Sequence, residues 1–378
     1  MRIVVVAHGL RTGGGISVGR NIIAALGRLA PEHQFLVTIP PKLGYEEVCA
    51  EIPQYETSVF GGGANLAQRW YYDIVELPRL VRRFGADVAL GLGNVAVQGV
   101  DMPQALLLHN PYYVYSRRHY GCSISRRMLL QIAVQRWQFA RDLRGIRLLL
   151  CQTKAMEERV RGVYGYRSPV QICPNAVSQF ALAEASKGSA FPASLARAAG
   201  KRRLLYLTAY YSHKNLEVLV DLFRDRASEL RDYAAVITVS PDQGAGATKL
   251  LKAIREHGLD DSIVNVGPLP QTEIASYFAN CHALLMPTLL ESFSGAYLEA
   301  MHFGLPILTS GLDFAREVCG DAASYFDPWD LNSIVGAIRG LEQRSVLVAK
   351  GKARLKEMFC SWDDVGQDVL RALEEMQK

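Results

Sequence analysis

The sequence lacks the long apolar segments that would place it in a membrane or a secretory pathway. No apolar run approaches the roughly 18–20 residues that a membrane-spanning helix requires. The first apolar run is too short for a signal peptide and ends at His8, where the chain turns polar. We therefore expect a cytoplasmic protein.

Paired cysteines and acidic metal motifs are missing as well. The seven cysteines are an odd number, and no two of them form a C-x-x-C pair. We expect reduced, mostly buried thiols instead of a disulfide framework or a zinc site. The sequence also has no D-x-D cluster, so no motif predicts a bound metal ion.

A strong excess of charge of one sign is absent. Charged residues make up 21% of the 378 residues and apolar residues 49%, and the net charge is +5. This balance is typical of a soluble globular protein, and the length suits two domains. The modest positive charge fits an acidic ligand or an anionic lipid surface, but it is too diffuse to indicate nucleic acid.

The chain opens as dinucleotide-binding folds do, but it lacks their fingerprint. A β-branched strand leads into a glycine-rich loop at 8–15 and then a helical pattern. The G-x-G-x-x-G motif fails at its last position, which is Val18. A nicotinamide or flavin enzyme is therefore disfavoured. Two interpretations stay open for the three glycines, close approach of the backbone to a ligand or a flexible turn; these residues are Gly13, Gly14 and Gly15.

Strand and helix patterns alternate through both halves of the chain. Strand patterns lie at 2–7, 35–39, 86–90, 104–108, 147–151 and 169–173, and then at 203–207, 234–239, 263–266, 283–286 and 305–309. Helical patterns lie at 16–30, 65–84 and 154–164, and then at 215–230, 248–257 and 271–280.

This alternation predicts an α/β protein with two Rossmann-like, doubly wound domains that face each other across a cleft. We expect the first domain at 1–180 and the second at 200–360. The stretch 174–201 has no sustained apolar period and reads as the boundary. A last helix at about 361–378 would fold back across the hinge to the first domain.

The stretch 291–310 is the candidate centre of a site. Its pattern predicts a loop, a helix that opens at Ser294 and ends at Gly304, and the start of a buried strand. Free N–H groups at a helix start attract anions, above all phosphate. Two carboxylates, Glu291 and Glu299, flank these N–H groups. Amide donors beside carboxylate acceptors suit a ligand with phosphate and several hydroxyls, such as a sugar nucleotide.

Two features of the first half each have two interpretations. His109 ends a strand pattern, and strand ends face the ligand crevice of such sheets; the alternative is a histidine with a structural hydrogen bond. A helical pattern at 123–144 is basic and amphipathic and contains Trp137. It fits a helix on anionic lipid, and the alternative is a packing helix with a solvated basic face.

With these parts in place, the sequence resembles the GT-B glycosyltransferases, specifically the retaining family 4 (glycosyl transferases group 1). The resemblance runs from Arg2 to about Asp327 and is strongest in the second half. The family's E-x7-E signature matches Glu291 and Glu299, and its G-x-P-V-I-x-S continuation matches F-G-L-P-I-L-T-S. Weaker matches are the P-N-G-V turn with I-C-P-N-A-V, the nucleobase loop with V-G-P-L, and the glycine loop.

The resemblance implies a phosphate site. Lys214 would bind the donor diphosphate together with the backbone amides of Phe293, Ser294 and Gly295. The family usually has an arginine where this chain has Ala209, which removes one phosphate clamp. Residues that would substitute for it are His213, Arg11 or Arg20.

The resemblance also implies roles around the sugar and the nucleoside. Glu291 would hold the donor sugar, and Glu299 would accept hydrogen bonds from ribose. His109 would touch the donor sugar, and the glycine loop would lie near the phosphates and the acceptor. The loop with Gly267 and Leu269 would receive the nucleobase.

The main hypothesis is a metal-independent, retaining hexosyltransferase without a resident cofactor. It would move a hexose, with mannose slightly preferred, from a nucleoside-diphosphate sugar to a glycan or lipid-linked glycan. The setting would be surface polysaccharide or lipopolysaccharide assembly, with peripheral contact to the inner face of the plasma membrane. The alternative, motivated by the missing arginine, is a non-catalytic nucleotide-sugar-binding GT-B module. A GT-B epimerase or phosphorylase is a third hypothesis, but no residue indicates the pyridoxal lysine of a phosphorylase.

Overall fold

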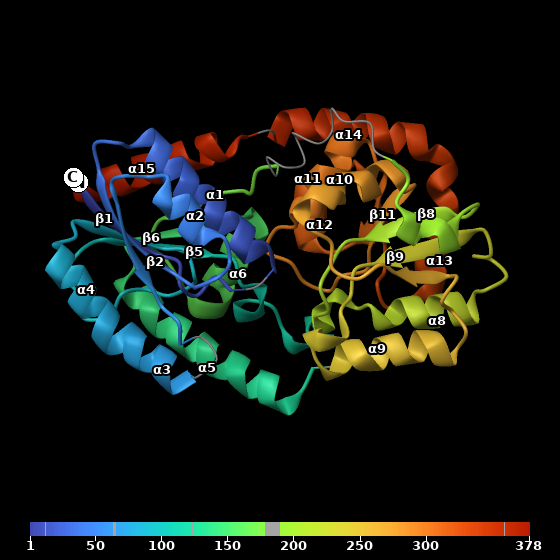
Figure 1. The fold of residues 1–378 in the computed structure, drawn as a ribbon, viewed down its shortest axis with the longest axis horizontal. Helices are drawn as coiled ribbons and strands as arrows, with labels where there is room; N and C mark the ends of the chain where they lie inside the picture. The colour runs from blue at the N-terminus through green and yellow to red at the C-terminus, as the bar shows by residue number, and fades with distance from the viewer. Residues whose placement is uncertain (12, 63–65, 122–123, 178–189, 359) are drawn as a thin grey trace. The chain divides into compact units, whose positions relative to one another are not determined.

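The structure is a computed structural model that describes the chain except residues 12, 63–65, 122–123, 178–189 and 359 (Figure 1). The chain divides into two compact units. Unit 1 contains Met1–Val114, Arg127–Ala176 and Cys360–Lys378, and unit 2 contains Tyr115–Arg126 and Val177–Phe359. The predicted boundary at 174–201 lies partly outside the described residues.

Unit 1 is built on a parallel, seven-stranded sheet in the order β3-β2-β1-β4-β5-β6-β7. Side chains of β1 alternate between two cores, with Ile3 and Val5 in one and Val4 and Val6 in the other. Because both faces are covered, the inner strands are continuous apolar runs. The strands are β1 (Arg2–Val6), β2 (Gln34–Ile39), β3 (Tyr55–Val59), β4 (Val88–Gly91), β5 (Gln104–Leu108), β6 (Leu148–Cys151) and β7 (Val170–Ile172).

Helices cover both faces of this sheet. The last helix, α15, packs along α1, and a Cβ atom at Gly366 would lie 2.7 Å from the Cβ of Ala25. On one face lie α1 (Gly13–Leu29), α2 (Tyr45–Ala50) and α15 (Trp362–Gln377), and on the other the π-helical η1 (Tyr72–Glu76) and α4 (Leu77–Phe84). The remaining helices are α3 (Leu66–Tyr71), η2 (Pro111–Tyr113), α5 (Arg126–Asp142), η4 (Leu143–Gly145) and α6 (Lys154–Tyr164).

Unit 2 repeats the arrangement with a parallel, six-stranded sheet in the order β10-β9-β8-β11-β12-β13. The first six strands of unit 1 are ordered in the same way, so the predicted pair of doubly wound sheets is confirmed. The strands are β8 (Arg202–Tyr206), β9 (Tyr233–Ile237), β10 (Ile263–Asn265), β11 (Ala283–Met286), β12 (Ile307–Ser310) and β13 (Ala323–Phe326).

The helices of unit 2 form two packed groups. One group consists of α8 (Glu217–Asp225), α9 (Ala245–Glu256) and α13 (Leu331–Arg339), and the other of α10 (Gln271–Asn280), α11 (Gly295–Phe303) and α14 (Arg344–Met358) (Figure 1). A further helix, α12 (Asp313–Cys319), follows β12. Short 3-10 helices are η3 (Arg117–His119), η5 (Ala193–Ala198), η6 (Ser212–Lys214), η7 (Pro241–Gln243) and η8 (Gly340–Gln343).

The main departure from the predicted elements concerns the glycine loop. Helix α1 begins at Gly13, so the three glycines form its first turn instead of a loop. Gly13 has φ 54°, a value that favours glycine. A Cβ atom at Gly14 would meet no described atom within 4 Å, so no contact among the described residues requires a glycine at that position.

No helix among the described residues is long and apolar enough to span a bilayer. Within the same residues, no group of three or more histidine, cysteine, aspartate or glutamate side chains could hold a metal ion. Six cysteines are free thiols, five of them buried, and Cys122 lies outside the described residues.

Candidate functional site

The loops after β8 and β11 lie where the strand order of unit 2 reverses. Strands β9 and β10 extend from β8 in one direction, and β12 and β13 extend from β11 in the other. In open α/β sheets, ligands bind at such a switch point, outside the carboxyl ends of the strands. Lys214 follows β8 at the end of η6, and Glu291 follows β11. The strand order therefore brings these two candidate residues to one place.

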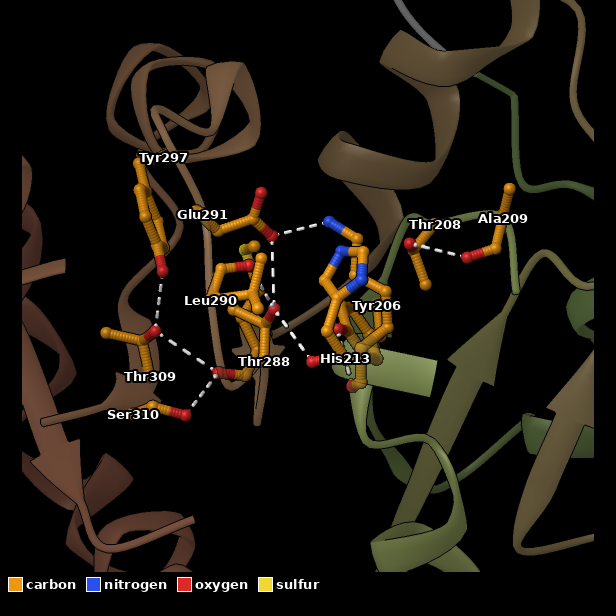
Figure 2. Close-up of polar contacts among 12 residues, drawn as sticks. Tyr206, Thr208, Ala209, His213, Thr288, Leu290, Glu291, Tyr297, Thr309 and Ser310 are labelled. Carbon is orange, nitrogen blue, oxygen red and sulfur yellow. Dashed lines mark hydrogen bonds and ion pairs between the residues drawn. The ribbon is translucent and has the colours of Figure 1, made fainter. Parts of the chain in front are cut away.

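Lys214 and Glu291 form an ion pair there. The Nζ atom of Lys214 lies 2.5 Å from Oε1 of Glu291, and the two side chains are 13% and 11% exposed. Figure 2 shows the Glu291 carboxylate at the centre of the polar contacts between the two loops. An ammonium group has three N–H donors, so Lys214 can hold Glu291 and still donate to a second anion.

Hydrogen bonds hold each of the two loops and also join them to each other (Figure 2). The Tyr206 hydroxyl donates to the carbonyl of Lys214 at 2.8 Å. The carbonyl of His213 accepts from the N–H of Leu289 at 2.8 Å. The Thr288 hydroxyl lies 3.1 Å from Oε1 of Glu291. Sequence reasoning missed Tyr206 and Thr288; the position of Thr288 at a strand end, three residues before Glu291, is the signal that could have found it.

The N-terminus of α11 lies in the loop that carries Glu291. Ser294 is the N-cap residue, and its side chain accepts no hydrogen bond from the first turn. A Cβ atom at Gly295 would meet no described atom within 4 Å. The first N–H groups of a helix lack intrahelical partners, so this open end suits an anion. Phe293 is buried before it, and Tyr297 anchors the helix through a 2.8 Å hydrogen bond between its hydroxyl and Thr309.

Glu299 lies in the second turn of α11 without a paired charge. Burial raises the pKa of its carboxyl group to about 7. Among the residues that the structure describes, the carboxyl has no ion pair and no hydrogen bond. Glu299 is only half-buried, so hydroxyl groups of a ligand could reach its carboxyl group and donate to it.

His213 is one of the suggested substitutes for the arginine that is missing at Ala209. Burial lowers the pKa of His213 well below its usual range, and the Lys214 ammonium group lowers it further. The His213 ring stacks on Tyr211 with centroids 5.5 Å apart. A neutral imidazole brings no positive charge, so His213 does not replace the charge of an arginine at position 209.

The candidate nucleobase loop follows β10 at the edge of the sheet. Gly267 has φ 74°, and its N–H donates to Oδ1 of Asn265 at 3.3 Å. Asn265 also exchanges two 2.9 Å hydrogen bonds with the backbone of Val239, and Leu269 is half-buried. Strand β10 is the second neighbour of β8, so the loop lies about 10 Å along the sheet edge from the strand that leads to Lys214.

In unit 1, His109 follows β5 and lies beside the first turn of α1. The backbone N–H groups of His109 and Asn110 donate to Oδ1 of Asn94 at 3.0 and 3.2 Å. A Cβ atom at Gly15 would lie 3.1 Å from Cε1 of His109, so Gly15 provides room for the ring. Burial lowers the pKa of His109 to about 4, which keeps the ring neutral near neutral pH.

A match to a known protein family lies within unit 2. The family Glycosyl transferases group 1 matches residues 189–356. The O-antigen chain mannosyltransferase B of Escherichia coli is 26% identical over 172 residues, which are 44% of this chain and 44% of that protein. The 2-deoxystreptamine glucosyltransferase of Streptomyces kanamyceticus is 26% identical over 258 residues, 65% of this chain and 62% of that protein. The chain thus spans less than two thirds of the length of both relatives.

Solved structures resemble the whole chain. HepE of Anabaena, solved in complex with UDP and glucose, superposes with a TM-score of 0.71 at 15% identity and covers 99% of this chain and 100% of that one. The likeness defines the fold class, which is GT-B. The fold and the family match within unit 2 together support a GT-B glycosyltransferase.

Proposed function

We propose that the protein is a glycosyltransferase that moves a hexosyl group from a nucleoside-diphosphate sugar to a glycan or lipid-linked glycan. The observation that carries the proposal is the Lys214–Glu291 ion pair at the switch point, in the same loop system as the open N-terminus of α11. The names of the two relatives, a mannosyltransferase of O-antigen chains and a glucosyltransferase, support a hexose. The first of these names supports mannose as the transferred sugar and surface polysaccharide assembly as the setting.

Negative charge develops on the diphosphate when the glycosidic bond of the donor breaks. The remaining N–H donors of Lys214 and the amides of Ser294 and Gly295 would stabilise this charge. Glu291 would accept hydrogen bonds from sugar hydroxyls and face the developing positive charge of the sugar. Glu299 would accept hydrogen bonds from the ribose. Because these donors belong to the chain itself, we expect transfer that does not require a metal ion.

We further propose retention of the anomeric configuration, with the departing phosphate taking the proton of the attacking hydroxyl on the same face. Three roles remain predictions. They are the contact of His109 with the donor sugar, the contact of Gly267 and Leu269 with the nucleobase, and the role of the first turn of α1.

The test is release of nucleoside diphosphate from a panel of UDP-, GDP- and ADP-hexoses, with a chelator present, followed by NMR of the product anomer. We expect turnover of at least one donor and a product of unchanged configuration. A chain that binds a nucleotide tightly but turns over no donor would instead support the non-catalytic module, which the alanine at position 209 favours.

We also propose that α5 lies on an anionic membrane surface. Leu130, Val134 and Trp137 are 68%, 48% and 65% exposed, and their spacing places them on one face of the helix. Arg126 is exposed at the start of the helix, and the guanidinium carbon of Arg141 lies 5.7 Å from the Trp137 ring centroid. An apolar stripe between arginines fits the boundary of headgroups and acyl chains. The predicted packing role also holds in part, since the opposite face buries Ile132 and Phe139.

Flotation with vesicles of phosphatidylcholine and phosphatidylglycerol tests this face. We expect a double variant, Leu130→Ala with Trp137→Ala, to bind about tenfold more weakly, because about 1–2 kcal/mol of apolar burial is lost. Val346→Ala is the control, since Val346 is 52% exposed on α14. Equal flotation of the double variant and the wild type would leave α5 as a packing helix.

A further inference from the structure

Residues Tyr115–Gly121 form an arm that belongs to unit 2, although the chain before Tyr115 and after Arg126 belongs to unit 1. The side chains of Tyr115, His119 and Tyr120 are buried, while those of Arg117 and Arg118 are exposed. This pattern indicates an element that packs one face against the rest of unit 2 and exposes the other face to solvent. The sequence had indicated only a mixture of tyrosines and arginines here.

The arm is fixed by its tyrosines. The Tyr115 hydroxyl donates to Oδ1 of Asp313, the first residue of α12, at 2.9 Å. The Tyr120 hydroxyl donates to the carbonyl of Tyr115 at 3.1 Å. The rings of Tyr115 and His119 meet edge to face with centroids 5.3 Å apart. Hydrogen bonds therefore join the two ends of the arm to each other and the arm to α12.

The end of the arm rests on the turn that carries Lys214. Gly121 has φ 85°, and a Cβ atom there would lie 2.0 Å from the carbonyl oxygen of Ser212. Both the backbone conformation and the contact require glycine. Ser212 is the first residue of η6, and Lys214 is the last. The arm thus packs against Ser212, two residues before Lys214. The ammonium group of Lys214 is the cation of the candidate phosphate site.

The arm also contacts Trp329, whose neighbour Pro328 binds the residue that follows Lys214. The His119 ring lies 6.3 Å from the ring of Trp329, centroid to centroid. The carbonyl of Pro328, which precedes Trp329, accepts from the side-chain amide of Asn215 at 3.1 Å. Asn215 directly follows Lys214, so the arm contacts one side of the lysine directly, at Ser212, and reaches the other side only through Trp329 and Pro328.

We propose that the arm positions Lys214 for the donor diphosphate, with Gly121 and Tyr115 as positioning residues. The ligand in this proposal rests on the proposed function. Lys214 must donate to Glu291 and to phosphate at the same time, and hydrogen bonds weaken steeply with small displacements of their atoms. The arm holds this turn at Ser212, and Pro328 holds it at Asn215. A turn held in this way keeps the Lys214 ammonium group within reach of both Glu291 and the phosphate.

The test compares Gly121→Ala and Tyr115→Phe with the matched controls Gly258→Ala and Tyr277→Phe. Gly258 also has a positive φ, 64°, but its Cβ position meets no described atom within 4 Å. Tyr277 is a buried tyrosine whose hydroxyl lies 2.6 Å from that of Ser194. Affinities are measured for UDP and GDP by calorimetry, and for uridine and guanosine by NMR titration.

We expect Gly121→Ala to weaken binding of the diphosphate about tenfold and Tyr115→Phe about threefold, as for loss of hydrogen bonds to a charged group. Binding of the nucleoside should stay unchanged, because it does not use Lys214. In a Lys214→Ala background, Gly121→Ala should have no further effect. A purely structural role would weaken nucleoside and diphosphate alike, and that result would overturn the proposal.

Hydrogen exchange of the ligand-free protein gives a measurement that does not depend on nucleotide. The N–H groups of Lys214 and Asn215 donate to the carbonyls of Tyr211 and Ser212 at 2.9 and 3.2 Å. We expect them to exchange at least about tenfold faster in Gly121→Ala than in Gly258→Ala. If Gly121→Ala does not fold, Tyr115→Phe and Tyr277→Phe form the same comparison.

The two measurements separate the two proposals. A wild-type chain that binds neither UDP nor GDP contradicts the proposed function, while exchange of the turn still tests the arm. Exchange rates that are equal in the arm variants and their controls overturn the arm as a positioning element.

Discussion

The first six strands of unit 1 have the same order as the strands of unit 2, but the two units differ in chemistry at equivalent places. The switch point lies between β8 and β11 in unit 2 and between β1 and β4 in unit 1. In unit 1, the loop after β1 contains His8, which is 1% exposed. Its Nε2 atom lies 2.8 Å from Asp73, and its Nδ1 atom lies 3.0 Å from Thr38. Burial lowers the pKa of His8, so this ring is neutral and already satisfied.

The difference between the two switch points shows that the fold alone does not provide a side chain with donors available for an anion. His8 has both ring nitrogens occupied, whereas Lys214 keeps N–H donors beyond the one that Glu291 accepts. Arg11, a suggested substitute for the missing arginine, lies in unit 1 and donates to the backbone carbonyls of His8 and Phe60 at 3.1 and 2.7 Å. We therefore propose that the leaving-group site lies in unit 2.

The largest effect should come from the ion pair of unit 2. We expect Lys214→Ala and Glu291→Gln each to lower kcat/KM at least about 100-fold, or about 2.7 kcal/mol of transition-state stabilisation. His8→Gln at the switch point of unit 1 should lower the melting temperature but change kcat/KM of the folded enzyme less than about threefold. Steady-state kinetics with the preferred donor measure both. Near-wild-type activity of Lys214→Ala would discard its role.

His109 offers an intermediate case, a residue of unit 1 with an implied role at the sugar. We expect His109→Ala to lower kcat/KM about tenfold through loss of a neutral hydrogen bond. Because burial lowers its pKa to about 4, the ring should not titrate under ordinary assay conditions. The pH profile of His109→Ala should therefore run parallel to that of the wild type. An inflection near neutrality that disappears in the variant would contradict the neutral ring.

Part of the candidate site can be predicted from the sequence, because short-range patterns define it. Helix α11 has a stop signal at Gly304, which adopts φ 68°, and buried strands on both sides, so short-range patterns predict it. The contact of Lys214 with Glu291 spans 77 positions of the sequence. It depends on β8 and β11 being neighbours, which no local pattern encodes.

Other features depend on packing that the sequence does not reveal. Trp137 belongs to an amphipathic pattern, but only the structure shows its ring exposed and its neighbour Phe139 buried. Gly121 is one of 32 glycines, and its contact with Ser212 comes from a distant turn. The first turn of α1 is another case, because three successive glycines disfavour a helix by propensity and packing overrides it.

The smallest effect concerns the pH dependence of donor binding in unit 2. The pKa of Glu299 is raised to about 7, so its carboxyl group is protonated below and ionised above that value. The ionised form accepts hydrogen bonds from ribose, so KM for the donor should fall about fivefold as pH rises from about 6 to about 8. Glu299→Gln should remove this dependence. A KM that rises with pH, or an unchanged profile in the variant, would contradict the assignment.

The most direct test of the central claim is calorimetric affinity for UDP and GDP in the wild type, Lys214→Ala and Glu291→Gln. If the charge of Lys214 is shared between Glu291 and the diphosphate, the two variants must diverge. We predict that Lys214→Ala binds the preferred nucleotide at least about tenfold more weakly, or about 1.4 kcal/mol. Glu291→Gln should bind it as tightly as the wild type or more tightly, because an uncompensated lysine favours an anion. Equal weakening in both variants, or none in either, would contradict the account.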